Sequence, residues 1–347
     1  MPVTSDIPIS DINETYYKKD YITSATSEIS VLANRIPLSG STVSVQAISN
    51  DIVFSTPEYV PNSNGCLTSE QIAYNIEEAP PFEEIAPYLV EDGEDYIDAD
   101  NVWNSLMAER VTISDNRTRV NPTNTSPYNR IGLVVAWYDK NENGQWDAGE
   151  ISKGSGSLQG PDVVLTSGHV IMTDGVWSHR VYYYPAKNGT GSDAAGEPYG
   201  QATSIACYVS SNWAVVGGNS NYDYGIVVIN RNIGALTGYN GKAWTSGSLV
   251  NKAVTMTGYP ADKTGSLSET MWKMSGTIKS ETAYKIYYDI YSAGGSSGSP
   301  VYDSSNVVWG VHTFGSSPYN GGIRITESIY NLLQTKLEEG LNRYYGS

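Results

Sequence analysis

The sequence has little cysteine, histidine or phenylalanine. Its 347 residues include two Cys, three His and three Phe. The cysteines, Cys66 and Cys207, are too few for a disulfide framework to hold the chain together. No glycine-rich turn surrounds either of them, which argues against a cysteine protease. The three histidines, His169, His179 and His312, are the only candidates for chemistry that needs an imidazole.

Long apolar runs are also lacking. None approaches the roughly 18 residues of a membrane-spanning helix, so we expect no membrane partner. Met1 is not followed by a basic patch and an apolar stretch, and we therefore expect no secretory signal within this chain.

Basic residues are scarce in the first third of the chain. Residues 1–110 contain 19 Asp or Glu and 4 Lys or Arg, a net charge of −15. Residues 111–347 contain 18 and 17, a net charge of −1, and the two parts sum to −16. So acidic a chain repels phosphates, which argues against nucleic acid as a partner. The asymmetry predicts an acidic pro-region over 1–110 and a separate domain over 111–347.

What the sequence does contain is glycine (34), tyrosine (27) and short Val/Ile/Tyr runs between Gly, Asn and Ser clusters. This pattern predicts a mainly β protein, built as an antiparallel barrel or sandwich. We expect strands at 131–138, 162–166, 181–184, 205–209, 224–229, 253–257, 276–279, 284–290 and 307–312.

Helical spacing appears mainly at the C-terminal end. Residues 326–337 place their apolar side chains on one face, with Thr326 as a cap and Gly340 as the end of the helix. For the pro-region we expect a mixed α/β structure, with a strand pair at 43–53 and helical segments at 68–90 and 101–110.

The segment YSAGGSSGSP, residues 291–300, surrounds Ser297 with small residues. Small residues allow a tight turn that exposes a serine hydroxyl beside backbone N–H groups, as a nucleophilic serine requires. Taken alone, the segment is better explained as a flexible Gly/Ser loop. A base and an orienting acid elsewhere in the chain would decide for the nucleophile.

Two other residues meet those needs. His169 ends the strand VVLTSGH, and Asp223 directly precedes the apolar strand YGIVVI. A carboxylate in apolar surroundings can fix the tautomer of an imidazole base and stabilise its cation. The order His169, Asp223, Ser297 is one of the orders known for this triad. Each residue alone also has an ordinary structural explanation, as a core histidine, a strand cap or part of a linker.

Three segments, TSGHV, DYGIVVI and GSSGSP, resemble the catalytic motifs of chymotrypsin-fold serine proteases, in that family's order. RTRVNPTNTSPYNRI from residue 117, GYPADK from 258, MWKMSGTI from 271 and the tail segment NGGIRIT resemble its bacterial glutamyl endopeptidase branch. The resemblance covers residues 111–347. It implies a chymotrypsin-like double antiparallel β-barrel with a C-terminal helix, preceded by the acidic pro-region.

The resemblance also implies roles for individual residues. His169 would be the general base, Asp223 its orienting partner and Ser297 the nucleophile. The backbone amides of Gly295 and Ser297 would form the oxyanion hole. Processing would occur between Arg110 and Val111, and the new amine would lie near the specificity pocket.

The specificity pocket follows from the same resemblance. Ser292 and His312 would bind the carboxylate of a substrate glutamate, since a hydroxyl and an imidazole can both donate to it. The backbone of Thr313, Phe314 and Gly315 would pair with the extended substrate.

Two alternatives stay open, one for the specificity of the pocket and one for the function of the protein. Family members often have Asp-Thr where this chain has Ile290–Tyr291, and the ring of Tyr291 could narrow the pocket. If His312 is a core histidine, the pocket takes an apolar side chain instead. A non-catalytic calcium-binding surface module on a protease-like scaffold is disfavoured, because all three triad positions are filled.

A second motif, DKNENGQWDAGE, occupies residues 139–150. It fits a twelve-residue calcium loop with Gly144 at the sharp turn, although a strand precedes it where an EF-hand has a helix. An acidic Asn/Gly-rich hairpin loop is the alternative. The predicted structural calcium ligands are Asp139, Asn141, Asn143, Gln145, Asp147 and Glu150.

These observations predict a secreted, extracellular serine endopeptidase precursor. It would cleave protein or peptide substrates after Glu, and less readily after Asp, through an acyl-enzyme. We expect a monomer with its own pro-region as a partner, a calcium ion, and no organic cofactor.

Overall fold

The structure is a computed structural model of the chain. It describes three strands of the N-terminal part, β1 (Tyr16–Asp20), β2 (Ser44–Ile48) and β3 (Asp51–Thr56). It also describes residues 113–345, except 142, 145–146, 148 and 216–217.

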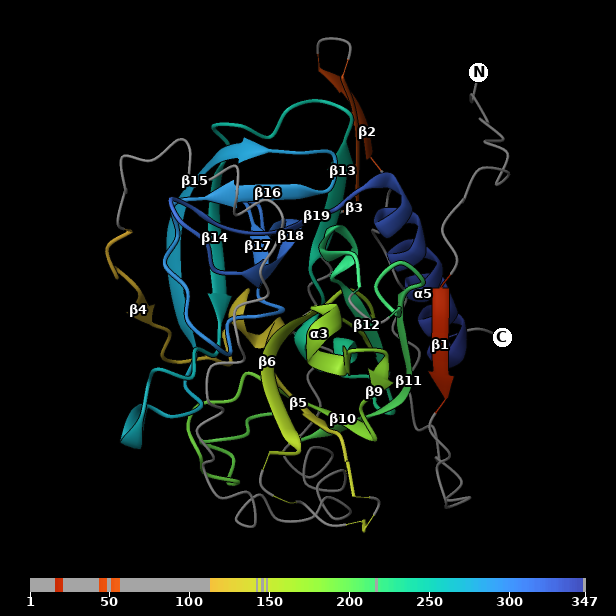
Figure 1. Cartoon of the computed structure of the whole chain (residues 1–347), viewed down its shortest axis with the longest axis vertical. Coiled ribbons are helices and arrows are strands. Elements are labelled where there is room, and N and C mark those ends of the chain that lie inside the picture. Colours follow the sequence, from red (N-terminus) through yellow and green to blue (C-terminus); the bar gives the residue numbers. More distant parts are fainter. Residues whose placement is uncertain are drawn as a thin grey trace.

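Six antiparallel strands form a first closed barrel (Figure 1). Their order around the barrel is β11-β10-β5-β6-β7-β12, and pairing of β11 with β12 closes it. The strands are β5 (Ile131–Trp137), β6 (Ile151–Leu158), β7 (Val163–Thr166), β10 (Arg180–Pro185), β11 (Ala202–Ser210) and β12 (Gly225–Ile229).

A second closed barrel has the order β17-β14-β15-β16-β19-β18, and pairing of β17 with β18 closes it. In Figure 1 its strands, in teal and blue, fill the upper part of the view. They are β14 (Ala253–Gly258), β15 (Trp272–Glu281), β16 (Lys285–Tyr288), β17 (Pro300–Tyr302), β18 (Val307–Phe314) and β19 (Asn320–Arg324).

Short elements decorate the barrels. β4 (Thr118–Arg119) pairs with β15, β13 (Gly241–Thr245) runs parallel to β18, and β8 (Met172–Thr173) pairs with β9 (Val176–Trp177). The short helices are α3 (Gly168–Ile171), α4 (Gly234–Thr237), η3 (Tyr128–Arg130), η4 (Ser220–Tyr222) and η5 (Gly265–Leu267).

The chymotrypsin-like fold predicted from the sequence is confirmed: two antiparallel barrels, not a sandwich, with a helix at the C-terminus. Each of the nine expected strands overlaps a strand of the structure. The pattern missed β1, β6, β13, β17 and β19, and the two-residue strands β4, β8 and β9.

Helix α5 (Glu327–Tyr345) differs from the prediction at its end. The hydroxyl of Thr326 accepts from the Ile329 N–H at 3.4 Å, as expected of a cap. Gly340 was expected to end the helix, and that was wrong, because the helix continues for another five residues. A Cβ at Gly340 would lie 2.5 Å from Asp162 Oδ1. Glycine is therefore present there for close packing, not for termination.

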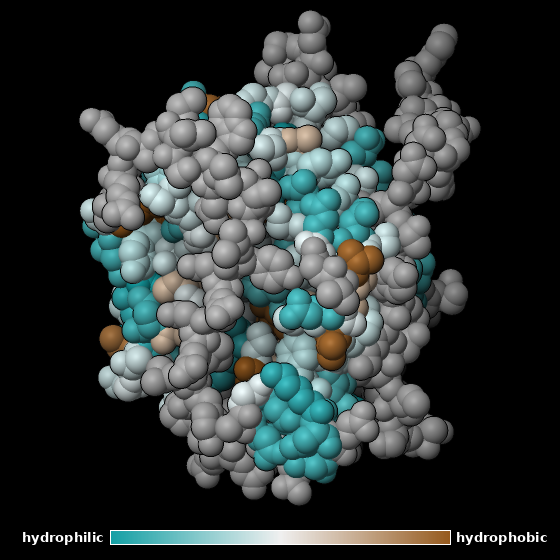
Figure 2. All heavy atoms as spheres, in the orientation of Figure 1, coloured by the Kyte–Doolittle hydropathy of each residue, from teal (hydrophilic) through white to brown (hydrophobic). Residues whose placement is uncertain are grey.

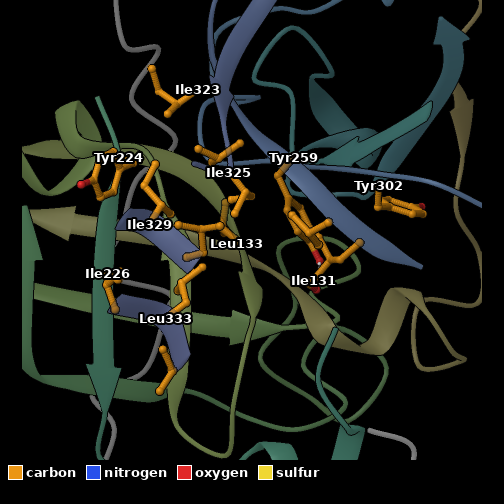
Figure 3. Packing of buried hydrophobic residues seen from close by; sticks show 14 of the residues in the cluster. Ile131, Leu133, Tyr224, Ile226, Tyr259, Tyr302, Ile323, Ile325, Ile329 and Leu333 are labelled. Atoms are coloured by element: carbon orange, nitrogen blue, oxygen red, sulfur yellow. Dashed lines mark hydrogen bonds between the residues drawn. The ribbon is translucent and has the colours of Figure 1, made fainter. Parts of the chain in front are cut away.

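One apolar cluster joins the two barrels and α5 (Figure 3). Leu133 and Ile226 come from the first barrel, Ile323 from the second, and Ile329 and Leu333 from α5. Burial of each such side chain stabilises the fold by about 1.5–3 kcal/mol. This shared core fixes the two barrels against each other, so loops from both can build one site.

The N-terminal strands pair with both barrels. β1 runs antiparallel along the part of β11 from Ala206 to Ser210, beyond the two residues that pair with β10. β3 pairs with β13 and with β2, so the expected strand pair at 43–53 is present. The expected helical segments at 68–90 and 101–110 lie outside the described residues.

The described surface is mainly hydrophilic in the face shown in Figure 2, with a few separate apolar residues. In the part of the chain that the structure describes, no helix is long and apolar enough to cross a membrane.

Candidate active site

His169 and Asp223 meet at the end of the first barrel that faces the second. β7 ends at Thr166, and His169 stands in the first turn of α3 directly afterwards. Its Nδ1 lies 2.7 Å from Asp223 Oδ2, and its backbone N–H donates to Asp223 Oδ1 at 2.9 Å. Both carboxylate oxygens are therefore used to hold this one residue. Trp213 contacts the imidazole edge to face, with ring centroids 6.5 Å apart.

The surroundings of His169 act on its pKa in opposite directions. Burial lowers the pKa, but the charge of Asp223 and its hydrogen bond raise it more, so the net shift is upward. The side chain keeps 31% of its surface exposed, while that of Asp223 keeps 10%. An imidazole held by a buried carboxylate, with its other nitrogen free to accept a proton, has the chemistry of a general base.

The loop around Ser297 is held by its carbonyl groups. The Gly294 carbonyl accepts from the Ala261 N–H at 2.7 Å, and the Ser296 carbonyl accepts from the Ser299 N–H at 3.0 Å. In a trans peptide the N–H points away from the carbonyl. The amides of Gly295 and Ser297 therefore point away from these anchors, and neither donates to any residue that the structure describes. Two backbone amides in one tight turn, those of Gly295 and Ser297, can hold an oxyanion if both point at it.

Two glycines make this loop possible. Gly295 and Gly298 have φ of 81° and 87°, a region that side chains disfavour. A Cβ at Gly295 would lie 2.5 Å from the Tyr259 carbonyl oxygen, and one at Gly298 would overlap the Ser155 carbonyl. Ser297, between the two glycines, is half-buried, and the close approach of Gly298 to Ser155 places this turn against the first barrel.

Backbone groups of Ser155 and His312 join the loops of the two barrels. The His312 carbonyl accepts from the Ser167 hydroxyl at 2.8 Å and from the Gly298 N–H at 2.7 Å. The Ser155 N–H donates to the Ser297 carbonyl at 2.7 Å. Ser167 directly precedes the helix of His169. The His312 carbonyl therefore connects the helix of His169 to the loop around Ser297 (residues 291–300, the nucleophile loop) through hydrogen bonds.

The predicted pocket residues lie on the second barrel. His312 and Thr313 are buried on β18, and the half-buried hydroxyl of Ser292 has no hydrogen-bond partner among the described residues. A Cβ at Gly315 would lie 3.8 Å from Ser292 Oγ. Gly315 and Ser292 are therefore neighbours across the strand end.

His312 is buried and makes a side-chain contact that the sequence did not reveal. The hydroxyl of Tyr288 lies 2.7 Å from His312 Nδ1. Burial, with a smaller contribution from the charge of His169, lowers the pKa of His312 to about 3. At neutral pH the imidazole is therefore an uncharged donor and acceptor.

Arg117 is a second residue that sequence reasoning missed. Its guanidinium lies 4.6 Å from the ring centroid of Tyr291 and pairs with Asp115 and Asp262. The Val120 N–H donates to the Met271 carbonyl at 2.8 Å. These contacts tie residues 115–120 to the second barrel beside the nucleophile loop, and they engage the Tyr291 ring. The position of Arg110 and Val111 lies outside the described residues.

The loop at 139–150 has several features of the predicted calcium site. The amides of Asn141 and Asn143 both donate to Asp147 Oδ2, at 2.7 and 2.6 Å. The Asp139 carboxylate accepts from the Gly144 N–H, and Gly144 has a φ of 72°. Oε2 of the buried Glu150 has no hydrogen-bond partner among the described residues of the chain.

The loop as described does not gather its carboxylates, however. Among the described residues there is no group of three or more His, Cys, Asp or Glu side chains placed to hold a metal ion. Gln145, one of the predicted ligands, lies outside them. The calcium site stays a prediction.

The other histidine and the cysteine have simple surroundings. The ring of His179 contacts that of Trp137, with centroids 4.6 Å apart, and Cys207 is buried and forms no disulfide with a described residue. Cys66 lies outside the described residues.

Comparison with known proteins identifies the family to which this fold belongs. The model of the trypsin-like peptidase domain matches residues 154–311, a range that includes His169, Asp223 and Ser297. A glutamyl endopeptidase of Bacillus licheniformis is 35% identical over 233 residues, which cover 63% of this chain and 66% of that protein. An extracellular metalloprotease of Bacillus subtilis is 31% identical over 236 residues, covering 66% of this chain and 70% of that protein.

This chain belongs to the trypsin-like peptidase family. The solved structure of a Glu endopeptidase in complex with MPD aligns with a TM-score of 0.55 and 29% identity, covering 66% of this chain and 99% of that one. The predicted kinship with the glutamyl endopeptidase branch is thereby confirmed. The chain spans just under two thirds of the Bacillus licheniformis relative's length.

Proposed function

We propose that this trypsin-like peptidase is a serine endopeptidase that cleaves after glutamate, and less readily after aspartate. The observation that carries the proposal is the contact of His169 with Asp223 at 2.7 Å, beside a serine loop with two free amides. The names of the relatives, glutamyl endopeptidase and Glu endopeptidase, support the choice of substrate.

In the proposed mechanism, Ser297 attacks the scissile carbonyl carbon while Nε2 of His169 takes the hydroxyl proton. Asp223 stabilises the resulting imidazolium, which then gives its proton to the leaving amine. The amides of Gly295 and Ser297 receive the oxyanion, and each such donor is worth about 3–4 kcal/mol of transition-state stabilisation. Water then attacks the acyl-enzyme, and the same groups repeat the steps in deacylation.

Selection of glutamate would come from donors at the base of the pocket. The Ser292 hydroxyl has no partner among the described residues, and a neutral imidazole supplies one N–H. A carboxylate only accepts, and hydrogen bonds to it are roughly twice as strong as those between neutral groups. The backbone of Thr313, Phe314 and Gly315 would hold the substrate strand next to this pocket.

The test is hydrolysis of matched peptides with Glu, Asp, Gln, Phe or Lys before the scissile bond. We expect kcat/KM to be highest for Glu and lower for Asp. Ser297→Ala, with its fold checked by circular dichroism, should lose at least about 10³-fold in kcat.

Cleavage after Phe in preference to Glu would overturn the pocket assignment and favour the apolar alternative. No cleavage of any peptide by processed protein would favour the non-catalytic module.

We infer that the chain is a precursor that is processed between Arg110 and Val111 and acts outside the cell. The anchoring of residues 115–120 beside Tyr291 supports a new N-terminus near the pocket, and the name of the Bacillus subtilis relative supports an extracellular site of action. N-terminal sequencing of active enzyme from culture medium tests both, and a start far from residue 111 would contradict the processing site.

We further propose that the loop at 139–150 binds a structural calcium ion. Glu150 Oε2 is buried and has no partner in the part of the chain that the structure describes, which suits a carboxylate oxygen that binds a cation. Asp139, Asn141, Asn143 and Asp147 would supply the other side-chain oxygens.

A further inference from the structure

The Tyr288 hydroxyl and the His312 ring form an isolated hydrogen-bonded pair inside the second barrel. Tyr288 ends β16 and His312 lies on β18, with β19 between these strands. The hydroxyl and Nδ1 are 2.7 Å apart, and the rings are tilted by 47°. Tyr288 is fully buried and His312 is 2% exposed, so water does not compete for this contact.

Burial decides the protonation state of both groups. It lowers the pKa of His312 to about 3, helped by the charge of His169 and opposed by a hydrogen bond to the Gly321 carbonyl. It raises the pKa of Tyr288 well above its usual value of 10. Over the working range of a protease the pair is therefore a neutral phenol and a neutral imidazole, which carries one N–H and one acceptor nitrogen.

The phenol must be the donor in this pair. Among the described residues, the Tyr288 hydroxyl has no other acceptor within reach than His312 Nδ1. If Nδ1 carried the proton instead, the buried O–H of Tyr288 would have no partner, which is costly. Nδ1 thus accepts, and the ring proton sits on Nε2.

The assignment leaves one donor on the ring. With Nδ1 accepting from the Tyr288 hydroxyl, the N–H of the neutral imidazole is at Nε2. A charged carboxylate accepts a stronger hydrogen bond from such an N–H than a neutral group does.

We propose that Tyr288 is a positioning residue that fixes His312 in the Nε2–H tautomer, and that this tautomer gives the pocket its preference for a carboxylate. The opposite tautomer would present a lone pair to the substrate carboxylate, which repels it. This inference rests on the proposed function, because it explains how the proposed glutamate selection arises.

The first arm of the test compares two Tyr→Phe variants of the second barrel. Tyr288→Phe removes the donor to His312. Tyr302→Phe is the matched control, because its buried hydroxyl contacts Thr257 Oγ1 at 2.8 Å and does not reach the pocket. We expect Tyr288→Phe to lower the ratio of kcat/KM for Glu peptides over Phe peptides by about 10- to 100-fold. This is the effect of losing a hydrogen bond from His312 to the charged carboxylate of the substrate.

Tyr302→Phe should leave this ratio unchanged within about twofold, whatever it does to the melting temperature. An unchanged ratio in Tyr288→Phe, or an equal fall in both variants, would overturn the proposal.

The second arm reads the tautomer directly by ¹⁵N NMR of histidine-labelled Ser297→Ala protein. We expect His312 to show a protonated Nε2 and an unprotonated Nδ1, and Tyr288→Phe to shift both signals toward a mixture. A protonated Nδ1 in the Ser297→Ala protein overturns the inference. If the enzyme does not prefer Glu but the tautomer is as expected, the proposed specificity fails while the role of Tyr288 on His312 stands.

Discussion

At the residue scale, the pair of His169 and Asp223 links protonation to activity. In the proposed mechanism the base must be neutral to take the proton of Ser297, and Asp223 raises the pKa of His169 above its usual 6.5. Activity should therefore fall as the pH drops through a value above 6.5. Asp223→Asn removes the charge that raises this pKa while burial still lowers it, so the acid limb of kcat/KM should move to lower pH.

The same substitution should reduce kcat by about 10³- to 10⁴-fold, since the amide no longer stabilises the imidazolium. Both effects are read from pH–rate profiles of the two proteins with one Glu peptide. Asp303→Asn, in the turn between β17 and β18, is a control that should keep the original profile. An acid limb that stays in place in Asp223→Asn would contradict the assigned partnership.

The residue scale also shows what the sequence could and could not predict. His169, Asp223 and Ser297 could be predicted because each stands in a short run whose neighbours dictate its conformation: the end of a strand, the start of a strand, and a glycine turn. Tyr288 and Arg117 were missed because their importance comes from contacts across 24 and 145 residues of chain. No local pattern marks such residues.

At the scale of elements, β6 was missed because its sequence, ISKGSGSL, carries the glycines and serines typical of a loop. The structure explains this composition. A Cβ at Gly154 would lie 2.9 Å from the Ser297 carbonyl oxygen, and one at Gly156 would lie 2.8 Å from Val134 and Val164 side chains. β6 needs small residues because the nucleophile loop packs on it at Gly154 and neighbouring strands pack on it at Gly156. This close packing outweighs the low strand propensity of glycine.

Helix α5 offers a prediction about close packing. Gly340→Ala should destabilise the protein by about 1–3 kcal/mol, although alanine is the better helix former, because its methyl would press on Asp162. Asn331→Ala, at an exposed position of the same helix, should change stability by less than about 0.5 kcal/mol. Urea unfolding of both variants measures the difference, and a Gly340→Ala protein as stable as its parent would contradict the packing argument.

The loop at 139–150 offers a prediction about metal removal. Calcium should raise the melting temperature and a chelator should reverse the gain, because the ion binds the folded loop only. Glu150→Gln should abolish this response, since a carboxamide is a poorer ligand than the proposed bidentate carboxylate. Glu338→Gln, the same change at an exposed site on α5, should retain it. A melting temperature that ignores both calcium and chelator would remove the ion from the proposal.

At the scale of the whole molecule, strands of the N-terminal part pair with a strand of the first barrel and with β13, which runs beside the second barrel. β1 lies along β11, and β3 lies along β13, each through backbone pairing (Figure 1). Backbone pairing at two places should hold this part to the enzyme even after the chain is cut, because the second contact forms at high effective concentration.

We therefore expect residues 1–110, once cleaved from the domain, to co-elute with it in size-exclusion chromatography. Lys18→Pro combined with Ser55→Pro should release the fragment, since proline removes the N–H of a paired strand. Alanine at the same two positions keeps the N–H and should leave the fragment bound. Release of the unmodified fragment on cleavage would show that the strand pairing is not sufficient.

The sequence predicted the architecture at this scale but not its assembly. The strand pattern implied an antiparallel barrel or sandwich, the family resemblance implied two barrels, and the charge asymmetry implied two parts. The place where β1 pairs depends on which strand edge the first barrel leaves open. That edge could not be predicted, because it exists only where β10 pairs with just two residues of β11.

The main chain and the side chain of His312 have different roles. Its main chain joins the base and nucleophile loops through a carbonyl oxygen that every amino acid has, while its side chain faces the substrate pocket in the proposed enzyme. A replacement at this position therefore keeps the backbone joint, while it changes what the pocket accepts and what the Tyr288 hydroxyl contacts. Substrate preference can drift here over evolutionary time, or be redesigned in the laboratory, without dismantling the catalytic apparatus.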